Sequence, residues 1–235
     1  MTALDLLRMQ HEGALDERGR LAGLYGFVVA RADDGEALWI GADVPDALAS
    51  ALTTAIEPSR RLVEAAAGCA LPLREGPSFV FDEHTRAVSS ARIVRSDAPG
   101  VDELRALNPG NWEPLEWDEL LDGRLGPWAM SLEGARVVSI CHTPGPMTAR
   151  AAECGVWTHP HFRGRGHAAA VTAEWAALLS PSGRRLFYST DSDNRSSQRV
   201  AERLRLRGIG VVHRVGRARD DAERGIHPLS ALRRR

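Results

Sequence analysis

The sequence predicts a mixed α/β fold with two domains, and three observations support this. Apolar runs with strand character alternate with runs of helical period in both halves of the chain. Three of the strand-like runs follow one another in the second half, which differs from the regular alternation of a doubly wound nucleotide-binding fold. A stretch rich in proline and glycine divides the chain between residues 70 and 90. We therefore expect an N-terminal α/β domain over residues 1–85 and a second domain over residues 86–235.

The first half contains a helix, a pair of strands and two further helices (residues 1–20, 23–32, 36–42, 45–56 and 59–70). Leu4, Leu7 and Leu15 recur at a spacing that places them on one face of the first helix. The two strands flank the sequence Asp33-Asp34-Gly35, which is typical of a hairpin turn. Pro45 is well suited to the first turn of the helix that follows.

The second half is expected to contain more elements, alternating after a meander (strand 91–96, helices 97–107 and 114–123, two strands within 126–145, strand 150–160, helix 167–179, strand 185–191, helix 195–206 and strand 209–216). Pro99 is expected in the first turn of its helix, and Gly123 is expected to end the next helix. Glu133-Gly134 is expected to turn the chain between the two strands of the meander.

The composition is that of a soluble globular protein. The 235 residues are 43% hydrophobic, with a formal net charge of −1, which gives no reason to expect nucleic acid or an anionic membrane as a partner. No apolar run approaches the roughly 18 residues of a membrane span. All basic residues are arginine, which excludes lysine nucleophiles and Schiff bases. Three cysteines without disulfide or metal spacing, and an N-terminus unlike a secretory signal, predict a reduced, cytoplasmic location.

A basic, glycine-containing loop precedes the helix at 167–179. It reads Arg163-Gly164-Arg165-Gly166, where helix capping would favour Ser, Thr, Asp or Asn. Glycines let the backbone approach a ligand, and successive N–H groups at a helix N-terminus bind anions. The loop therefore suits a pyrophosphate, although a surface turn in an arginine-rich chain is the alternative. A P-loop is excluded because it needs Gly-Lys-Ser/Thr, and the glycine spacing differs from the dinucleotide-binding fingerprint.

The run "AECGVWTHPHFRGRGHA" resembles the GNAT-type N-acetyltransferase superfamily, whose acetyl-CoA loop reads Gln/Arg-x-x-Gly-x-Gly/Ala. Residues 163–168 fit that pattern. The run "YSTDSDNRSSQRVAERL" is similar to the next strand and helix of the family, which an asparagine opens. The resemblance covers about residues 91–219. It implies a GNAT-type fold with an additional N-terminal α/β domain, which would complete the acceptor pocket or be a degenerate GNAT-like half.

The resemblance implies acetyl-CoA as acyl donor and direct transfer of acetyl to a primary amine, without a metal. The backbone of the strand would bind the pantetheine arm, the loop would bind the pyrophosphate, and the start of the next helix would lie beside the arm. The implied cofactor-binding residues are Val156, Trp157, Thr158, Arg163, Gly164, Arg165, Gly166, His167, Ala168, Asn194 and Ser197.

Direct transfer needs a neutral amine, so the resemblance also implies a general base. Glu153, on the cofactor strand, is the first candidate, and a solvated glutamate paired with an arginine is the alternative. His142 is the second candidate, because the turn at 143–150 is expected to bring residues 141–142 opposite 153–154; a structural histidine is the alternative.

The chain departs from the family at the position of the acid that protonates the leaving thiolate. The family often has a tyrosine seven residues after the helix-opening asparagine, and this chain has Ala201 there. Tyr188, on the preceding strand, is the substitute that we consider, although it could serve packing only, and water could protonate the thiolate. The departure favours a second hypothesis, an acyl-CoA-binding regulatory or interaction module without turnover.

Two further groups of residues bear on ligands. Cysteine and histidine residues cluster in sequence, but alternation along a strand separates neighbours and we expect no metal site (Cys141, His142, Cys154, His159 and His161). Glu116, Asp118 and Glu119 would favour a cationic amine acceptor, a small molecule or peptide, although solvation also explains them. The protein would be a monomer or homodimer.

Overall fold

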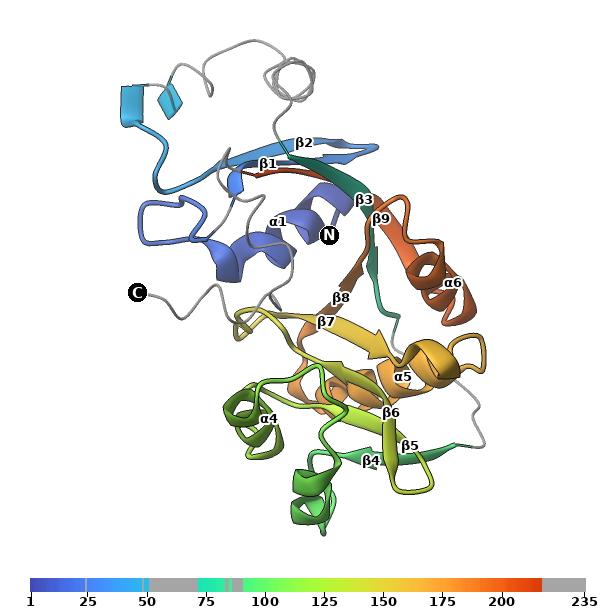
Figure 1. The fold of residues 1–235 in the computed structure, drawn as a ribbon. Helices are drawn as coiled ribbons and strands as arrows, with labels where there is room; N and C mark the ends of the chain where they lie inside the picture. Colours follow the sequence, from blue (N-terminus) through green and yellow to red (C-terminus); the bar gives the residue numbers. More distant parts are fainter. Residues whose placement is uncertain (24, 48, 51–71, 83–84, 86–90, 217–235) are drawn as a thin grey trace. The chain divides into compact units, whose positions relative to one another are not determined.

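A computed structural model describes residues 1–23, 25–47, 49–50, 72–82, 85 and 91–216 (Figure 1). The chain forms two compact units, which are described separately: a first unit (Met1–Ser78, Ser189–Asn194, Gly208–Arg235) and a second unit (Phe79–Tyr188, Arg195–Arg207). The helix expected at 59–70, and all but the first turn of that at 45–56, lie outside the described residues. Within the described ranges no helix combines the length and apolar character that crossing a membrane requires.

The first unit begins with helix α1 (Ala3–His11), which is shorter than the sequence predicts. The Thr2 side chain accepts a hydrogen bond from the Asp5 N–H in a capping box, and Leu4 and Leu7 are buried as expected. The helix does not reach residue 20. A 3-10 turn η1 (Glu12–Ala14) follows, and the Asp16 side chain then accepts from the backbone N–H groups of residues 18 and 20, which holds a loop.

Four strands complete the first unit, in the order β2-β1-β9-β3. The predicted hairpin is confirmed: β1 (Tyr25–Ala32) and β2 (Gly35–Ile40) pair antiparallel, and β9 (Arg207–Gly216) pairs with β1 from the other side. The Pro- and Gly-rich stretch forms strand β3 (Leu73–Val80). Gly76 is required there because a Cβ would lie 1.8 Å from the Thr190 carbonyl oxygen.

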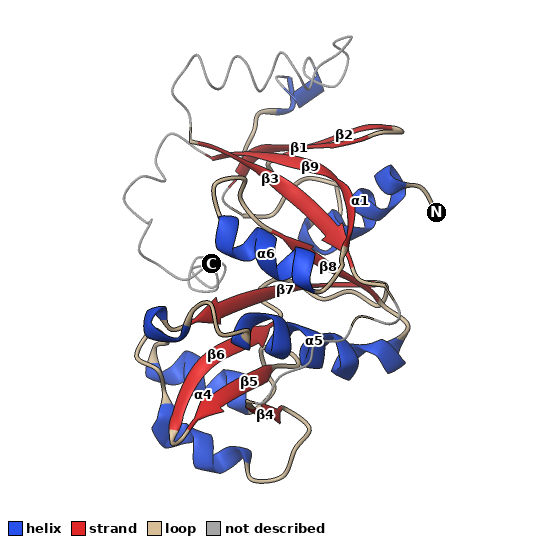
Figure 2. Cartoon of the chain, turned by 90° about the vertical axis from the view of Figure 1, so that its right-hand side faces the viewer, coloured by secondary structure: helices blue, strands red, loops and turns tan. Residues whose placement is uncertain are grey.

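The second unit contains strands in the order β8-β7-β6-β5-β4. Strands β4 (Arg92–Arg95), β5 (Ala129–Glu133), β6 (Arg136–His142) and β7 (Ala151–Thr158) pair antiparallel as a meander, and β7 pairs in parallel with β8 (Arg185–Ser189). The predicted strands are therefore confirmed. Helix α5 (His167–Leu179), with the bounds that the sequence predicts, packs against β4 to β7 (Figure 2).

Three helix predictions in the second unit have different outcomes. Helix α4 (Pro114–Leu121) is confirmed, and Gly123 follows it with a positive φ of 74°. Residues 101–107 form a 3-10 helix, η2, not an α-helix, and Gly100 with φ 80° rather than Pro99 stands at its start. Helix α6 (Arg195–Arg203) ends three residues earlier than expected, with Arg205 in the left-handed region at φ 53°.

The core of the second unit lies between α5 and one face of its sheet. Cys141, Ala152 and Cys154 point into this core together with Val171 and Trp175 of α5. Because neighbouring strand residues face opposite sides, His142 and Glu153 lie on the other face.

The register of β6 and β7 corrects one expectation. His142 pairs with Gly155 and Cys141 pairs with Val156, so residues 141–142 do not lie opposite 153–154. Thr148 accounts for the shift, because its side chain accepts from the Ala151 N–H and its own N–H donates to the Ala151 carbonyl. This local turn uses residues that the simple hairpin would have placed in the ladder.

Candidate functional site

Strand β7 separates from β8 halfway along its length. Pairing with β8 runs from Ala151–Arg185 to Cys154–Tyr188, whereas pairing with β6 involves Gly155 to Thr158. Within the described residues, the second half of β7 therefore has a partner strand on one side, and its other edge is available to a ligand.

The register decides which backbone groups reach this edge. The His159 N–H donates to the Val138 carbonyl at 2.9 Å, and antiparallel bonding of this kind recurs at every second residue. The backbone of Trp157 therefore faces β6, while the N–H and C=O groups of Val156 and Thr158 face away from it. The Arg163 Nε–H donating to the Thr158 carbonyl at 3.3 Å is consistent with this direction.

The loop from Arg163 to Ala168 connects this strand to α5. A 3-10 turn, η3 (Pro160–Phe162), ends the strand where Pro160 was expected to end it. Gly164 and Gly166 have φ values of 78° and 91°, a region that L-residues with side chains rarely adopt. Gly166 is the N-cap of α5 and offers no capping side chain, so the N–H groups of the first helical turn point toward whatever lies beyond the helix start.

The His167 side chain has a structural environment. It is 4% exposed, its Nδ1 is 2.9 Å from the Ser131 hydroxyl, and its Nε2 is 3.5 Å from a Glu133 carboxylate oxygen. These contacts fix the first turn of α5 to β5. His167 can therefore contribute only its backbone N–H to a ligand at the loop.

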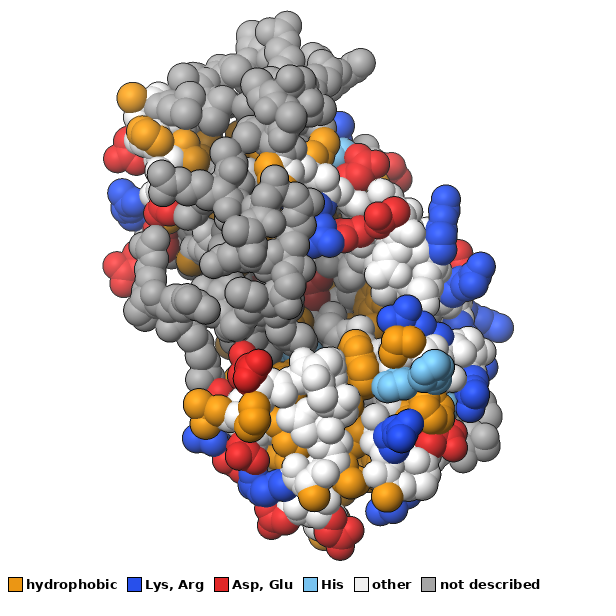
Figure 3. Space-filling model, in the orientation of Figure 1, with side chains coloured by type: hydrophobic (Ala, Val, Ile, Leu, Met, Phe, Trp, Pro, Cys, Tyr) orange, Lys and Arg blue, Asp and Glu red, His pale blue; other side chains and the backbone are white. Residues whose placement is uncertain are grey.

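The loop itself carries two arginine side chains. Arg163 and Arg165 are exposed, and the Arg165 guanidinium lies 5.0 Å from the centre of the Phe162 ring. The centre of the His159 ring lies 5.4 Å from that of the His161 ring and 5.5 Å from that of the Phe162 ring. Figure 3 shows histidine, arginine and hydrophobic side chains gathered on the surface of this unit.

A further arginine, Arg203 at the end of α6, reaches the same loop. A Cβ on Gly166 would lie 3.2 to 3.4 Å from its guanidinium atoms. Sequence reasoning missed Arg203; the available signal was its recurrence with Arg195 and Arg199 at intervals of four residues, which is one face of a helix.

The two candidate bases share the sheet face opposite α5. Glu153 is half-buried and pairs with Phe187 in the ladder, whereas His142 is 4% exposed and contacts the Trp112 ring edge-on at 5.0 Å. His142 pairs with Gly155, so Glu153 is its diagonal neighbour, at a typical separation of about 7–8 Å. Their juxtaposition therefore differs from the expected one but still places both on one surface.

Tyr188 lies in the core on the other face, next to Cys154. Its hydroxyl donates to the Ser197 hydroxyl at 3.0 Å, and burial raises the pKa of the phenol. Ala201 is fully buried in the same core, so a tyrosine at this position would need space that the packing does not leave. Asn194 directly precedes α6, and its N–H donates to the Asp191 carbonyl within the first unit.

The acidic residues near α4 have different environments. Asp118 forms an ion pair with Arg105, which also pairs with Asp102 and Asp122. Glu119 is buried and Glu116 is half-buried. The described structure thus assigns Asp118 to an ion-pair network that joins η2 to α4.

The sulfur and imidazole groups do not form a metal centre among the described residues. No group of three or more His, Cys, Asp and Glu side chains converges there. Cys141 and Cys154 are free and buried, and burial raises the pKa of the Cys154 thiol, with Cys141 contributing. A buried, protonated thiol is unreactive, as expected of a small hydrophobic residue. Cys69 lies outside the described residues.

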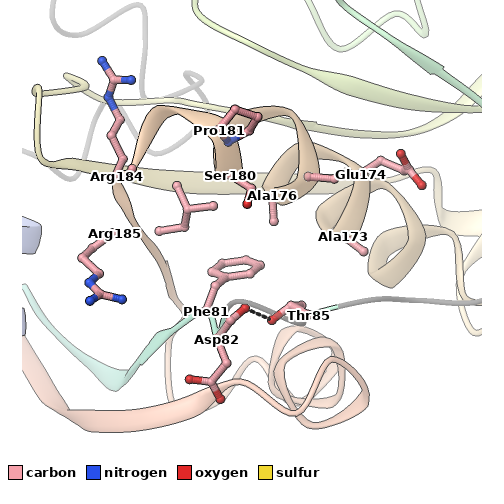
Figure 4. A pocket seen from close by; sticks show the side chains of 13 residues that line it. Phe81, Asp82, Thr85, Ala173, Glu174, Ala176, Ser180, Pro181, Arg184 and Arg185 are labelled. Carbon is pink, nitrogen blue, oxygen red and sulfur yellow. Dashed lines mark hydrogen bonds between the residues drawn. The ribbon is translucent and has the colours of Figure 1, made fainter.

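A cavity of about 610 Å³ lies at the C-terminal half of α5, away from the loop (Figure 4). Its lining includes the Phe81 ring, which faces Ala176, and the charged side chains of Glu174 and Arg185. None of the residues expected to bind acetyl-CoA lines this cavity. Its mixed charges select no class of ligand.

Comparison with known proteins identifies a family. A family model described as "Acetyltransferase (GNAT) domain" matches residues 92–207. No protein of curated function is significantly similar in sequence.

Solved structures similar to this chain include three acetyltransferases or related proteins. A putative GNAT acetyltransferase from Novosphingobium aromaticivorans DSM 12444 has 23% identity and a TM-score of 0.47, with 61% of this chain and 64% of that chain covered. A GNAT acetyltransferase from Colwellia psychrerythraea has 12% identity and a TM-score of 0.47, with 87% and 84% covered. A GCN5-related N-acetyltransferase-like protein from Streptococcus suis 89/1591 has 14% identity and a TM-score of 0.49, with 92% and 98% covered. This chain thus spans less than two thirds of the first of these proteins.

Proposed function

Residues 92–207 belong to the GNAT acetyltransferase family, and we propose that the protein transfers an acetyl group from acetyl-CoA directly to a primary amine. Members of this family move an acyl group from acyl-CoA to an amine. The observation that carries the proposal is the separation of β7 from β8 directly before a glycine loop that opens α5.

The residues present fit an acyl-CoA. The free edge at Val156 and Thr158 offers N–H and C=O groups that could pair with the amides of a pantetheine arm, as another strand would. The loop from Arg163 to Ala168 offers backbone N–H groups, the positive end of the α5 dipole and two exposed arginine side chains to a pyrophosphate. Acetyl-CoA, when bound, supplies the activated acetyl group.

Asn194 and Ser197 remain in the proposal as residues beside the cofactor arm. They stand at and near the start of α6, where a side-chain amide or hydroxyl can bond a ligand amide. Trp157 would contribute through its side chain or its position in the strand, because its backbone faces β6.

Glu153 is the proposed general base. A carboxylate on the strand that binds the donor can accept a proton from the attacking amine, either directly or through one water. The acceptor would then approach from the sheet face opposite α5, where His142 and Trp112 also lie.

Tyr188 is the proposed source of the proton for the leaving thiolate, acting through Ser197. The hydrogen bond from the Tyr188 hydroxyl to the Ser197 hydroxyl provides a path for the proton, and the tyrosinate that the transfer leaves would regain a proton from solvent by the same path. Burial raises the pKa of Tyr188 and so weakens it as an acid, which favours water as the competing proton source. The Ser197 hydroxyl would donate to the thiolate while it accepts from Tyr188.

Two measurements test the proposal and its rival, a binding module without turnover, which the buried Ala201 favours. Titration calorimetry with acetyl-CoA should show binding; its absence would contradict both functions. Release of coenzyme A, followed with a thiol reagent across small-molecule and peptide amines, should exceed the background rate for at least one class. Binding without release across that panel would favour the module. We further propose a cytoplasmic monomer or homodimer.

A further inference from the structure

Arg203 lies flat against the glycine that opens α5. The Nη1, Nη2 and Cζ atoms of its guanidinium lie 3.2, 3.3 and 3.4 Å from the position that a Gly166 Cβ would occupy. Three atoms at nearly one distance mean that the plane of the guanidinium faces Gly166. The N–H groups, which lie in that plane, therefore point past the loop and not into it.

The Arg203 guanidinium forms no ion pair within the described part of the chain, although carboxylates are plentiful there. Many other arginines do pair with carboxylates (Arg8, Arg20, Arg31, Arg74, Arg95, Arg105 and Arg124). Arg203 thus has no carboxylate partner among the described residues, and it lies next to the loop that carries Arg163 and Arg165. An exposed guanidinium that lies against Gly166 and has no carboxylate partner among the described residues is suited to bind an anion from solution.

We infer that Arg203 binds the 3′-phosphate of coenzyme A, an inference that rests on the proposed function. The N–H groups of the first turn of α5 have no capping side chain and are assigned to the pyrophosphate in the proposed function, whereas the N–H groups of Arg203 point past the loop. The remaining phosphate of the ligand is a monoester on the ribose, with a charge of about −2 near neutral pH. A monoester presents two oxygens side by side, which matches the two parallel N–H groups of a guanidinium. Gly166 is needed because a side chain there would displace this group.

The 3′-phosphate can be removed from the ligand without changing the rest, so the test compares coenzyme A with 3′-dephospho-coenzyme A. Calorimetric titration of the full chain should show tighter binding of coenzyme A. Arg203→Gln should lower the affinity for coenzyme A about 10- to 100-fold, the range for hydrogen bonds between charged groups, and leave the affinity for the dephospho form unchanged. Arg203→Lys should restore part of the loss, because it keeps the charge without the fork.

Arg199→Gln is the matched control, since Arg199 is exposed one turn earlier on α6 and its loss removes the same charge. This variant should bind both ligands like the unchanged protein. If Arg199→Gln loses as much affinity for coenzyme A as Arg203→Gln does, only the net positive charge of the surface matters, and the inference is overturned. Equal losses for the two ligands in Arg203→Gln would assign Arg203 to the pyrophosphate and also overturn it.

The inference and the proposed function fail in different ways. If the unchanged protein binds both ligands with one affinity, the 3′-phosphate is not recognised and the inference fails while the proposed function stands. If it binds neither ligand, the proposed function fails and the inference with it. Unchanged affinity for the dephospho form in Arg203→Gln would also show that the variant is folded.

Discussion

Replacing Gly166 with alanine separates the two demands on this position, backbone conformation and space. The φ of 91° costs an L-residue about 1–2 kcal/mol, and the added Cβ would lie 3.2 Å from the nearest Arg203 nitrogen. The end of an arginine side chain moves easily, so the contact adds little to the stability cost. Gly183→Ala, outside the loop, has a similar φ of 71° and meets no atom within 4 Å, so it bears the conformational cost only.

We therefore expect both variants to lose about 1–2 kcal/mol of unfolding free energy, measured by urea denaturation. In Gly166→Ala the guanidinium also shifts from its phosphate-binding position, which should reduce the affinity for coenzyme A by up to about tenfold, or roughly 1.4 kcal/mol. Calorimetry would measure this loss against Gly183→Ala.

A double-mutant cycle identifies the cause of the loss. In an Arg203→Gln background, Gly166→Ala should cost no further affinity for coenzyme A, because the group that it displaces is already absent. A loss of the same size in both backgrounds would refute this reasoning, since the alanine would then act on the loop itself. Equal affinities of Gly183→Ala and Gly166→Ala would refute it as well.

Three other substitutions test the site and the fold. Glu153→Gln should slow amine acetylation at least about 100-fold and leave the dissociation constant of coenzyme A unchanged, and an unaltered rate at every pH would exclude Glu153 as the base. Because burial raises the pKa of Tyr188, the unfolded state ionises first, so unfolding free energy should fall as pH rises above about 10. Tyr188→Phe should flatten this fall in alkaline denaturation experiments, and an unchanged slope would argue against a buried phenol. Gly76→Ala would place a Cβ 1.8 Å from the Thr190 carbonyl oxygen and should lose at least about 3 kcal/mol of unfolding free energy in urea denaturation. Gly208→Ala, which has no atom within 4 Å, should lose little. Similar losses in the two variants would contradict the close approach at Gly76.

The sequence determined the elements around the site because their signals are local. Helix α5 begins and ends where the loop glycines and the apolar period place it, and the strands of the meander are bounded by Gly134 and Pro160. The family pattern at residues 163–168 is likewise a local motif. Local signals were weaker in the short segment η2: Gly100 and the proline after Asn108 mark its ends, but they do not distinguish a 3-10 helix from an α-helix.

Only the tertiary structure determined the features that depend on contacts between segments distant in the sequence. The register of β6 against β7 follows from the Thr148 turn, and it determines that His142 faces Gly155 and that Val156 and Thr158, not Trp157, turn their backbone groups to the free edge. Tyr188 and Ala201 share one core, and Arg203 reaches Gly166 from a helix 37 positions later in the chain. Sequence patterns specify which face a residue takes within its own element, but the contacts between elements arise only when packing fixes their distance and orientation.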